Sequence, residues 1–308
     1  MKDSPQRRLR IALIAATAAG ALALSACGSS DSGSSSSTAS AAATSGGAEV
    51  TGGADVEAAK AALIDPSALT MCTSLSYKPF EYTEGDQVVG FDVDLMQLAA
   101  TQLGTTVKVI DTPFEGIKSG DAMATGKCDA AAAGMTINPE REKVILFSIP
   151  YFDATQAMVV AADSTATSLA DLRGKRVAGQ TGTTGLDYLK ANADANGYEI
   201  VEYADFPSES DSLLTGQVDA AVQDLPVFNQ FVKDNEGKVK VAAQFNTGEQ
   251  YGVGMKLGNT ALKNVVDSSI EAAKADGTYD AIYEKWIGGT PPASSGGAAA
   301  SSTAPSSN

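Results

Sequence analysis

A short internal repeat constrains the fold of this chain more than any other feature of its sequence. Residues 125–131 read Thr-Gly-Lys-Cys-Asp-Ala-Ala, and residues 215–221 read Thr-Gly-Gln-Val-Asp-Ala-Ala. Each segment closes a predicted helix, turns at the glycine and enters a strand of small residues. Shared turn chemistry alone can produce one such match, since a short repeat is weak evidence. Taken as a true repeat, it predicts two similar lobes whose matched strands end at Gly134 and Asp224.

The flanking sequence alternates between strand-like and helix-like segments, which is typical of α/β folds with largely parallel sheets. Helix stop signals support this pattern, as at Gly104, which follows a predicted helix where a C-cap belongs. The predicted strands cover residues 69–73, 88–91, 107–110, 128–134, 176–179, 199–203, 218–223 and 251–255. The predicted helices cover residues 92–103, 114–125, 169–172, 186–196, 209–215, 227–235, 262–274 and 279–286.

The chain is expected to cross twice between the lobes. The C-terminal segments return to the first lobe, so the crossings fall near residues 155–158 and 246–248. Lobe 1 then comprises residues 65–156 and 247–288, and lobe 2 comprises residues 157–246. A double connection predicts a hinge made of two strands. Because ligands in open α/β sheets bind beyond the carboxyl ends of strands, the two matched strand ends should face one cleft.

The N-terminal residues predict export from the cytoplasm. A basic head precedes the apolar residues 11–24, a stretch too short to remain as a membrane span. Next comes Leu24-Ser25-Ala26-Cys27, which resembles the lipobox of bacterial lipoproteins. We therefore predict a signal peptide over residues 1–26 and a lipid anchor with palmitate on Cys27. The alternative is an ordinary signal peptide that happens to contain a cysteine at this place.

Two low-complexity segments flank the predicted folded body. Residues 27–60 consist mainly of Ser, Gly, Ala and Thr, and residues 289–308 repeat that composition. Segments with so few bulky apolar side chains cannot offset the entropy lost on ordering. The first segment is therefore predicted to be a flexible tether and the second a disordered tail.

The remaining cysteines form an even pair if Cys27 carries lipid. In an oxidising compartment, Cys72 and Cys128 are then expected to form one disulfide. The alternative is two free buried thiols, because sequence spacing does not show that the two residues are adjacent in space.

Charge and composition exclude several classes of function. The chain has a formal net charge of −15, so it should repel nucleic acid and anionic lipid. It contains no histidine, which excludes His-based catalytic triads, His-rich zinc sites and the usual general base near neutral pH. We predict no cofactor and no metal site.

Arg141 is a candidate ligand-binding residue because of its position in a predicted helix start. Asn138 has the features of an N-cap and Pro139 those of the first helical residue, which places Arg141 in the first turn. The helix macrodipole disfavours a cation there, whereas a guanidinium is well suited to bind a carboxylate with two hydrogen bonds. The alternative is an exposed arginine paired with Glu140 or Glu142.

Two candidate residues or turns belong to the second lobe. The turn Gly182-Thr183-Thr184-Gly185 joins a predicted strand to a helix, where free N–H groups can bind an anion. It lacks the spacing of a dinucleotide fingerprint and the lysine of a Walker A loop, and such a turn is often only structural. Asp224 follows an apolar strand and could bind an ammonium group or cap the next helix.

Three aromatic residues and one acidic pair complete the candidates. Tyr77, Phe80 and Phe114 follow predicted strands and could stack on a ligand, although packing in the core is the simpler interpretation. The pair Asp92 and Asp94 suggests a metal, but without further ligands it is better explained as a helix cap and a solvated face.

Several motifs together resemble the polar amino-acid solute-binding proteins of ABC transporters, a family of bacterial extracellular solute-binding proteins. The similarity extends in order from residue 69 to residue 288. Its motifs are Ser76-Tyr77-Lys78-Pro79-Phe80-Glu81, Gly90-Phe91-Asp92-Val93-Asp94-Leu95, Gly134-Met135-Thr136 with Pro139-Glu140-Arg141, Phe147-Ser148 with Pro150-Tyr151, Gly182-Thr183-Thr184, Asp276-Gly277-Thr278-Tyr279, and Glu284-Lys285-Trp286. The resemblance implies the type II periplasmic binding protein fold, with two Rossmann-like lobes and a two-strand hinge.

The resemblance also implies a role for individual residues. Arg141 and Thr184 would hold the α-carboxylate of an amino acid, with help from Thr136. Asp224 and the backbone around Gly134 would bind the α-ammonium group. The side-chain pocket would be lined by Ser74, Tyr77, Phe114 and Gln180. Many family members carry Asp at the position of Ser74, so a cationic ligand is disfavoured and a polar uncharged one such as glutamine is preferred.

The resulting hypothesis is a monomeric, lipid-anchored binding protein at the extracytoplasmic face of the bacterial membrane. It would have no enzymatic activity and would deliver an L-amino acid to an ABC importer, whose permease and ATPase are separate chains. One alternative is a dehydratase-like enzyme on the same fold, which would need an Asp or Glu as its acid or base. Another is a ligand-sensing component, although the chain carries no signalling domain.

Overall fold

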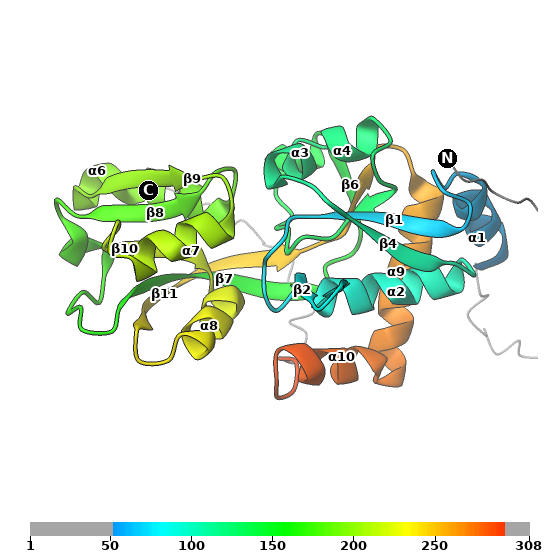
Figure 1. The fold of residues 1–308 in the computed structure, drawn as a ribbon. Coiled ribbons are helices and arrows are strands. Elements are labelled where there is room, and N and C mark those ends of the chain that lie inside the picture. Colours follow the sequence, from blue (N-terminus) through cyan, green and yellow to red (C-terminus); the bar gives the residue numbers. More distant parts are fainter. Residues whose placement is uncertain (1–51, 293–308) are drawn as a thin grey trace, which may run out of the picture. The chain divides into compact units, whose positions relative to one another are not determined.

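The computed structural model describes residues 52–292, and its core consists of two mixed five-stranded sheets. Their strand orders are β4-β1-β5-β12-β6 and β11-β7-β10-β8-β9. Helices pack on the sheets, as the ribbon in Figure 1 shows. This arrangement confirms the α/β class and the type II fold predicted from the sequence.

The first sheet belongs to lobe 1, and its strand β1 (Ala68–Thr73), which lies between β4 and β5, is buried along its whole length. Leu69 and Met71 pack in one hydrophobic cluster with helix α2, whereas Cys72 belongs to a second cluster with α3 and α4. Burial on both faces explains why apolar residues occupy both faces of this strand. The other strands are β4 (Thr106–Asp111), β5 (Ala130–Ala131), β6 (Ile145–Phe147) and β12 (Gly254–Lys256), and a hairpin comprises β2 (Tyr82–Glu84) and β3 (Gln87–Val89). The helices are α1 (Gly52–Ala61), α2 (Phe91–Gln102), α3 (Phe114–Lys118), α4 (Asp121–Ala124), α5 (Pro139–Glu142), α9 (Thr260–Asp276) and α10 (Thr278–Trp286).

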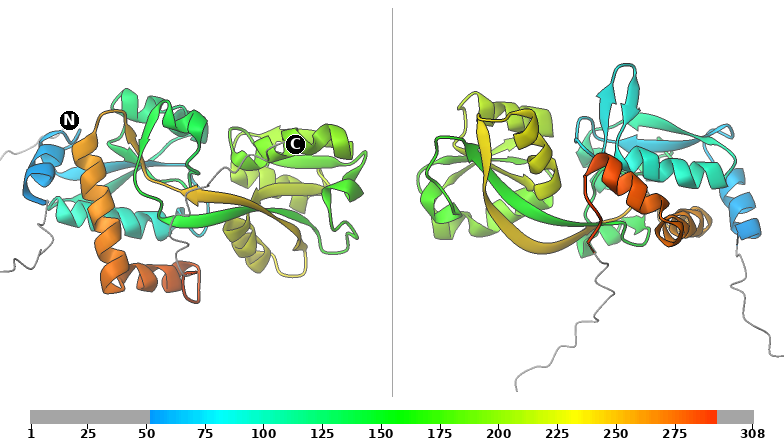
Figure 2. Two further views of the ribbon diagram at one scale, coloured as in Figure 1. Left: turned by 180° about the vertical axis from the view of Figure 1, so that it is seen from behind. Right: turned by 90° about the horizontal axis from the view of Figure 1, so that it is seen from below.

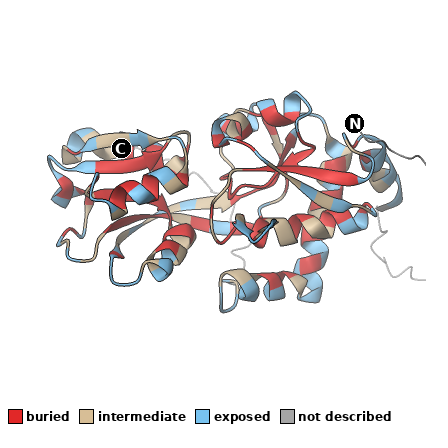
Figure 3. Ribbon diagram, in the orientation of Figure 1, coloured by how far each residue is buried: buried red, intermediate tan, exposed pale blue. Residues whose placement is uncertain are grey.

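The second sheet belongs to lobe 2 and is built around β10 (Ala220–Asp224), all of whose residues are buried. Figure 3 shows that burial concentrates along the inner strands of both sheets. The neighbouring strands are β7 (Phe152–Ala161), β8 (Arg176–Gln180), β9 (Glu199–Tyr203) and β11 (Val239–Tyr251). The helical elements are the 3₁₀ turn η1 (Leu169–Leu172), α6 (Thr184–Asn196), α7 (Phe206–Leu214) and α8 (Leu225–Asp234).

The two repeated segments adopt the same local structure. Thr125 and Thr215 each end a helix, and each hydroxyl donates to the carbonyl four residues earlier, at 2.7 and 2.8 Å. Gly126 and Gly216 follow with φ values of 75° and 70°. In each lobe the aspartate then accepts a backbone N–H from the neighbouring strand. Asp129 accepts that of Thr70 in β1, and Asp219 accepts that of Arg176 in β8, both at 2.9 Å. The repeat therefore marks equivalent turns in two similar lobes.

Strands β7 and β11 form the antiparallel ladder at the edge of the second sheet. They pair from Val239 opposite Ala161 to Tyr251 opposite Phe152, with register shifts after Val241 and after Phe245. Both strands can be followed side by side in the two views of Figure 2. The predicted crossings near 155–158 and 246–248 fall within these strands, which makes β7 and β11 the elements of the proposed hinge.

The N-terminal tether prediction is wrong for its last residues. Residues 52–61 form helix α1, although the tether was expected to reach residue 60. Val56, Ala59 and Leu63 are spaced to lie on one face and join the largest hydrophobic cluster of the core, and Asp55 accepts a 2.9 Å hydrogen bond from Asn264. Docking on α9 stabilises a segment whose composition alone predicts no structure. The signal peptide, Cys27 and most of the C-terminal tail lie outside the described residues.

Several other predicted elements differ from the structure. The strand predicted over residues 128–134 is only Ala130–Ala131, and the one predicted over residues 251–255 is divided between the end of β11 and β12. The single helix over residues 114–125 is interrupted at Gly120, which has φ 78° and an environment where a Cβ atom would lie 2.7 Å from the carbonyl oxygen of Val144. The predicted strand over residues 88–91 ends earlier, because Phe91 begins α2. Among the helices of residues 52–292, none combines the length and apolar character needed to cross a membrane.

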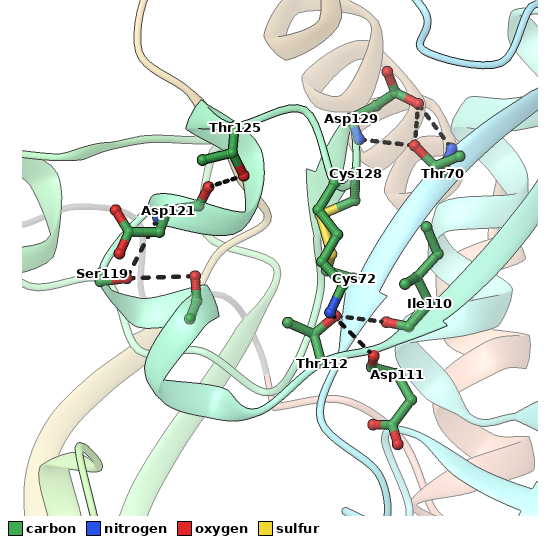
Figure 4. Close-up of a disulfide and its surroundings, with 12 residues drawn as sticks. Thr70, Cys72, Ile110, Asp111, Thr112, Ser119, Asp121, Thr125, Cys128 and Asp129 are labelled. Atoms are coloured by element: carbon green, nitrogen blue, oxygen red, sulfur yellow. Dashed lines mark hydrogen bonds between the residues drawn. A yellow bond between two sulfur atoms is a disulfide. The ribbon is translucent and has the colours of Figure 1, made fainter.

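The predicted disulfide between Cys72 and Cys128 is present in the structure. Their Cα atoms lie 5.7 Å apart, and both residues are buried beneath α3 and α4. Figure 4 shows the bond next to Asp129 and Thr70, whose mutual hydrogen bonds tie the end of the same turn to β1. Covalent and polar contacts thus fix the turn that precedes β5.

Removal of this disulfide should destabilise the protein without changing its fold. The bond links residues 56 positions apart, and closing a loop of that length contributes about 4 kcal/mol in the chain-entropy model. We expect Cys72→Ala with Cys128→Ala to lower the free energy of unfolding by about this amount in urea denaturation. A reductant should lower the stability of the wild type and leave the double variant unchanged. Equal stability of the two oxidised proteins would contradict the prediction.

Candidate functional site

All of the predicted ligand-binding residues line a single pocket between the two lobes. Its space amounts to about 400 Å³, including the part open to solvent. The predicted residues that line it are Ser74, Tyr77, Phe114, Gly134, Thr136, Arg141, Gln180, Thr184 and Asp224. Sequence analysis did not identify Glu81, Phe206 and Gln223, which also line the pocket.

Arg141 occupies the pocket wall through its position in α5. The Asn138 side chain accepts the Arg141 backbone N–H at 2.9 Å, and Pro139 stands in the first turn, as predicted. The guanidinium donates to the carbonyl oxygen of Thr136 at 2.6 Å and to that of Gly182, in the other lobe, at 3.1 Å. A guanidinium has five N–H donors, so these two bonds leave further donors for a ligand.

The alternative of an exposed Arg141 paired with a neighbouring glutamate is excluded. Arg141 is buried, with 6% of its surface exposed, and Glu140 instead pairs with Lys143 at 2.6 Å. The guanidinium carbon lies 5.4 Å from the centre of the Phe114 ring, which identifies one function of this predicted wall residue. Burial lowers the pKa of Arg141, and the charges of Asp224 and Glu249 oppose that shift.

Asp224 stands at the end of β10 and at the N-cap position of α8, but its side chain makes no capping hydrogen bond. Its carboxylate instead accepts a hydrogen bond from the hydroxyl of Tyr77 at 2.8 Å, and others from the hydroxyl of Tyr251 and the amide of Gln156. The structure therefore favours the pocket over the helix cap. Burial, with a smaller contribution from the charge of Glu249, raises the pKa of Asp224 to about 6, although these hydrogen bonds oppose the shift.

Thr136 and Thr184 face each other across the lobes, with 3.5 Å between their hydroxyl oxygens. Each hydroxyl donates to the carboxylate of Glu249, at 2.9 Å from Thr136 and 2.8 Å from Thr184. Sequence analysis did not identify Glu249. Its one available signal was its place beside the predicted crossing at 246–248.

The Gly182-Thr183-Thr184 turn forms the start of α6. The Thr183 hydroxyl accepts the backbone N–H of Leu186 at 3.2 Å and donates to the carbonyl of Gln180 at 2.8 Å. Gly182 has φ 82°, in the left-handed region that L side chains rarely adopt. Glycine is therefore required at this turn, which places Thr184 at the pocket.

Aromatic side chains divide between the pocket and the core. Tyr77 meets Phe206 edge to face, with 5.7 Å between ring centres, and both line the pocket. Phe80 is fully buried, with its ring 5.0 Å from that of Phe152 and 5.2 Å from that of Tyr251. The candidate Phe80 is therefore a core residue.

Asp92 and Asp94 do not form a metal site. Asp92 is fully buried and accepts hydrogen bonds from the Gly134 backbone N–H at 2.9 Å and from the hydroxyl of Tyr151 at 2.8 Å. Asp94 instead binds the side chains of Lys285 and Trp286. Within residues 52–292 no group of three or more side chains has the composition and proximity of a metal site. The function of Asp92 is to hold the backbone of Gly134 at the pocket.

Glu81 lies beside Asp92 and is also fully buried. Neither of its carboxyl oxygens accepts a hydrogen bond from another of the described residues. Burial raises the pKa of Glu81 well above its usual value, and the charge of Asp92 adds to this shift. Burial likewise raises the pKa of Asp92 to about 7. This acidic pair therefore retains protons at pH values where exposed carboxyl groups are ionised.

A two-lobed α/β scaffold with a charged pocket between its lobes defines a solute-binding protein of the type II periplasmic fold. Comparison with known families agrees, since residues 69–289 match the bacterial extracellular solute-binding proteins, family 3. This chain belongs to that family. Its members are extracytoplasmic, and its curated relatives include amino-acid-binding proteins of ABC transporters.

Individual relatives show what kinds of protein are similar. The putative ABC transporter arginine-binding protein 2 of Escherichia coli (strain K12) is 32% identical over 71% of this chain and 90% of its own length. An ancestral arginine-binding protein, solved with arginine and with glutamine, is 38% identical with a TM-score of 0.68, covering 72% of this chain and 99% of that one. A third is an ancestral amino-acid-binding protein described as a precursor of cyclohexadienyl dehydratase. It is 35% identical with a TM-score of 0.66, covering 72% of this chain and 96% of that one.

The raised pKa values of Glu81 and Asp92 predict that the unliganded protein is most stable in mild acid. In the unfolded chain carboxyl groups ionise near pH 4, whereas Asp92 in the native state keeps its proton until about pH 7. Between these values the native state binds more protons than the unfolded state. The free energy of unfolding should therefore fall as the pH rises from about 4 to about 7, which urea denaturation across this range would measure.

Two variants identify the source of this slope. Glu81→Gln removes one acid of the pair and its repulsion of the other, so it should reduce the slope. Burial also raises the pKa of Glu209 and Asp224, so part of the slope should remain. The exposed control Glu57→Gln should keep the slope of the wild type. An unchanged slope in Glu81→Gln would refute the assignment to this pair.

Proposed function

We propose that this protein captures an L-amino acid and delivers it to an ABC importer. The observation that supports this function best is a pocket that contains both a buried guanidinium, from Arg141, and a buried carboxylate, from Asp224. Buried charges are costly unless they are paired, and an amino acid offers an α-carboxylate to the first and an α-ammonium group to the second. Family membership and the amino-acid-binding relatives support the same function.

In this proposal both lobes contribute to the ligand. Arg141 and the backbone around Gly134 come from lobe 1, over residues 65–156 and 247–288, whereas Thr184, Gln180 and Asp224 come from lobe 2, over residues 157–246. Thr136 and the wall residues Ser74, Tyr77 and Phe114 complete the site. Ligand binding then closes the lobes about β7 and β11.

The side chain of the ligand is proposed to end in N–H donors. The pocket wall carries the acceptor groups of Ser74 and Gln180 and the carboxyl group of Glu81. Guanidinium and amide groups both satisfy such acceptors. The ancestral relative solved with arginine and with glutamine supports this pair of candidates. Ser74 favours glutamine, whereas Glu81 and the arginine-binding relatives favour arginine.

A thermal-shift screen of the mature protein against the L-amino acids tests the proposal. Arginine or glutamine should raise the melting temperature, because a ligand that binds only the native state stabilises it by mass action. In Arg141→Lys the same ligand should bind at least about tenfold more weakly, since lysine keeps the charge but loses the planar fork. The control Arg173→Lys changes an exposed arginine of lobe 2 and should bind as the wild type does.

Two outcomes would contradict these statements. If none of the amino acids shifts the melting temperature, the protein does not capture an amino acid. If Arg141→Lys binds as tightly as the wild type, Arg141 does not hold the carboxylate.

We further propose that the protein is lipid-anchored through Cys27 at the extracytoplasmic face of the membrane, as a monomer. The support is the sequence Leu24-Ser25-Ala26-Cys27, which follows an apolar stretch and precedes a Ser, Gly and Ala segment. Permease and ATPase would be separate chains that receive the amino acid from it.

Replacement of Cys27 should release the protein from the membrane. The variant Cys27→Ser keeps the shape of the cleavage site but removes the thiol that would carry the lipid. We expect the wild type to fractionate with membranes and to incorporate labelled palmitate, and the variant to do neither. The nearby control Ser29→Ala should behave as the wild type does, and palmitate incorporation by Cys27→Ser would disprove the anchor.

An enzymatic function has no specific support in this structure. The dehydratase precursor among its structural relatives is itself described as an amino-acid-binding protein. We therefore make no proposal of catalysis or of a sensory function.

A further inference from the structure

Glu249 holds a position in β11 where three separate parts of the protein meet. One of its carboxylate oxygens, Oε2, accepts the Thr136 hydroxyl of lobe 1 at 2.9 Å and the Thr184 hydroxyl of lobe 2 at 2.8 Å. The same oxygen accepts the amide N–H of Gln156, on β7, at 3.1 Å. Glu249 therefore links the two lobes and the two hinge strands through a single carboxylate.

These hydroxyls are the groups that a bound amino acid would need. A hydroxyl has only one proton, so a threonine that donates to Glu249 cannot at the same time donate to a ligand carboxylate. The charge of Glu249 also acts on Arg141, because it opposes the lowering of the Arg141 pKa by burial. The chemistry around Glu249, two threonine hydroxyls near a buried guanidinium, is the chemistry proposed for the α-carboxylate of the ligand.

The local backbone explains how Glu249 reaches this position. Pairing between β7 and β11 is interrupted after Phe245 and resumes with Glu249 opposite Ala154. An irregularity in a ladder bends the strand and redirects the side chains that follow it. Thr155, next to Ala154 on β7, uses its hydroxyl to bind the carbonyl of Phe245 within the interrupted segment.

We propose that Glu249 sets the affinity for the ligand by occupying the hydrogen-bond donors of its α-carboxylate in the unliganded protein. This inference rests on the proposed function. While Glu249 holds the two threonines, it also joins the lobes. A ligand binds only after Glu249 has released the two threonines, so the population that can bind is a fraction of the total and the apparent affinity falls by that fraction.

Removal of the charge at Glu249 should therefore strengthen binding. Hydrogen bonds to an ionised acceptor are roughly twice as strong as those to a neutral one, so Glu249→Gln weakens the competition. We expect the dissociation constant of L-arginine or L-glutamine, whichever the wild type binds, to fall about tenfold in isothermal titration calorimetry. Glu249→Ala removes both acceptor oxygens and should bind at least as tightly as Glu249→Gln. The control Glu236→Gln changes an exposed glutamate of lobe 2 and should not alter the dissociation constant.

Small-angle X-ray scattering of the unliganded proteins provides a second readout that a purely structural role would not change. Without Glu249 to link Thr136 and Thr184, the lobes should separate more often, and the radius of gyration of Glu249→Gln should exceed that of the wild type. Addition of the amino acid should bring both proteins to the same value.

The proposal fails if Glu249→Gln binds the amino acid no more tightly than the wild type, or if the two unliganded proteins scatter alike. These failures differ from a failure of the proposed function. A wild type that binds no amino acid refutes the proposed function, and the scattering of unliganded wild type and variant still tests whether Glu249 links the lobes.

Discussion

The desolvated carboxylate of Asp224 is the group on which the arrangement of the site depends. Its hydrogen-bond donors come from three parts of the chain: Tyr77 of lobe 1, Gln156 of β7 and Tyr251 at the end of β11. An ionised group with so little contact with water needs such partners, because burial without them costs several kcal/mol. The need to satisfy one carboxylate therefore brings the lobes and the hinge strands together at the same point.

The equivalence of the lobes explains where the functional groups lie and why they differ. The repeated Thr-Gly-x-x-Asp-Ala-Ala segments give both lobes the same turn and the same entry into a central strand, with Asp129 and Asp219 in matching positions. At the far ends of these strands the equivalence stops. In lobe 1, β5 ends at Ala131 and the chain continues to Gly134, whose backbone N–H donates to the buried Asp92, whereas in lobe 2 β10 itself ends at Asp224. A common scaffold thus presents a backbone group on one side of the pocket and a carboxylate on the other.

Local signals were enough to predict most of this scaffold, and they failed where structure depends on distant contacts. The cap at Asn138 and the glycine after α2 act through neighbouring residues, so the sequence shows them directly. Helix α1 depends on docking against α9, more than two hundred residues away in the sequence, and its composition resembles that of a tether. The contacts of Glu249 could not be predicted from neighbouring residues either, because its partners Thr136 and Thr184 are 113 and 65 positions away. No residue pattern in the surrounding Asn-Thr-Gly-Glu-Gln segment indicates that the Glu249 carboxylate accepts hydrogen bonds from both lobes.

The distribution of charge explains why an acidic pocket suits a zwitterion. Arg141 is the only cation among the lining residues, whereas Asp224 and Glu81 line the same pocket and Glu249 lies directly behind its threonines. If all three carboxyl groups were ionised, they would outweigh the guanidinium and repel an incoming carboxylate. Burial reduces this excess, because it raises the pKa of Glu81 well above its usual value and favours its neutral form. In the proposed function, Asp224 then pairs with the ligand ammonium group, and Glu249 competes with the ligand carboxylate for the two threonines. On that proposal, a buried acid that stays protonated and a second acid that releases its threonines together allow an anionic pocket to accept a ligand that carries both charges.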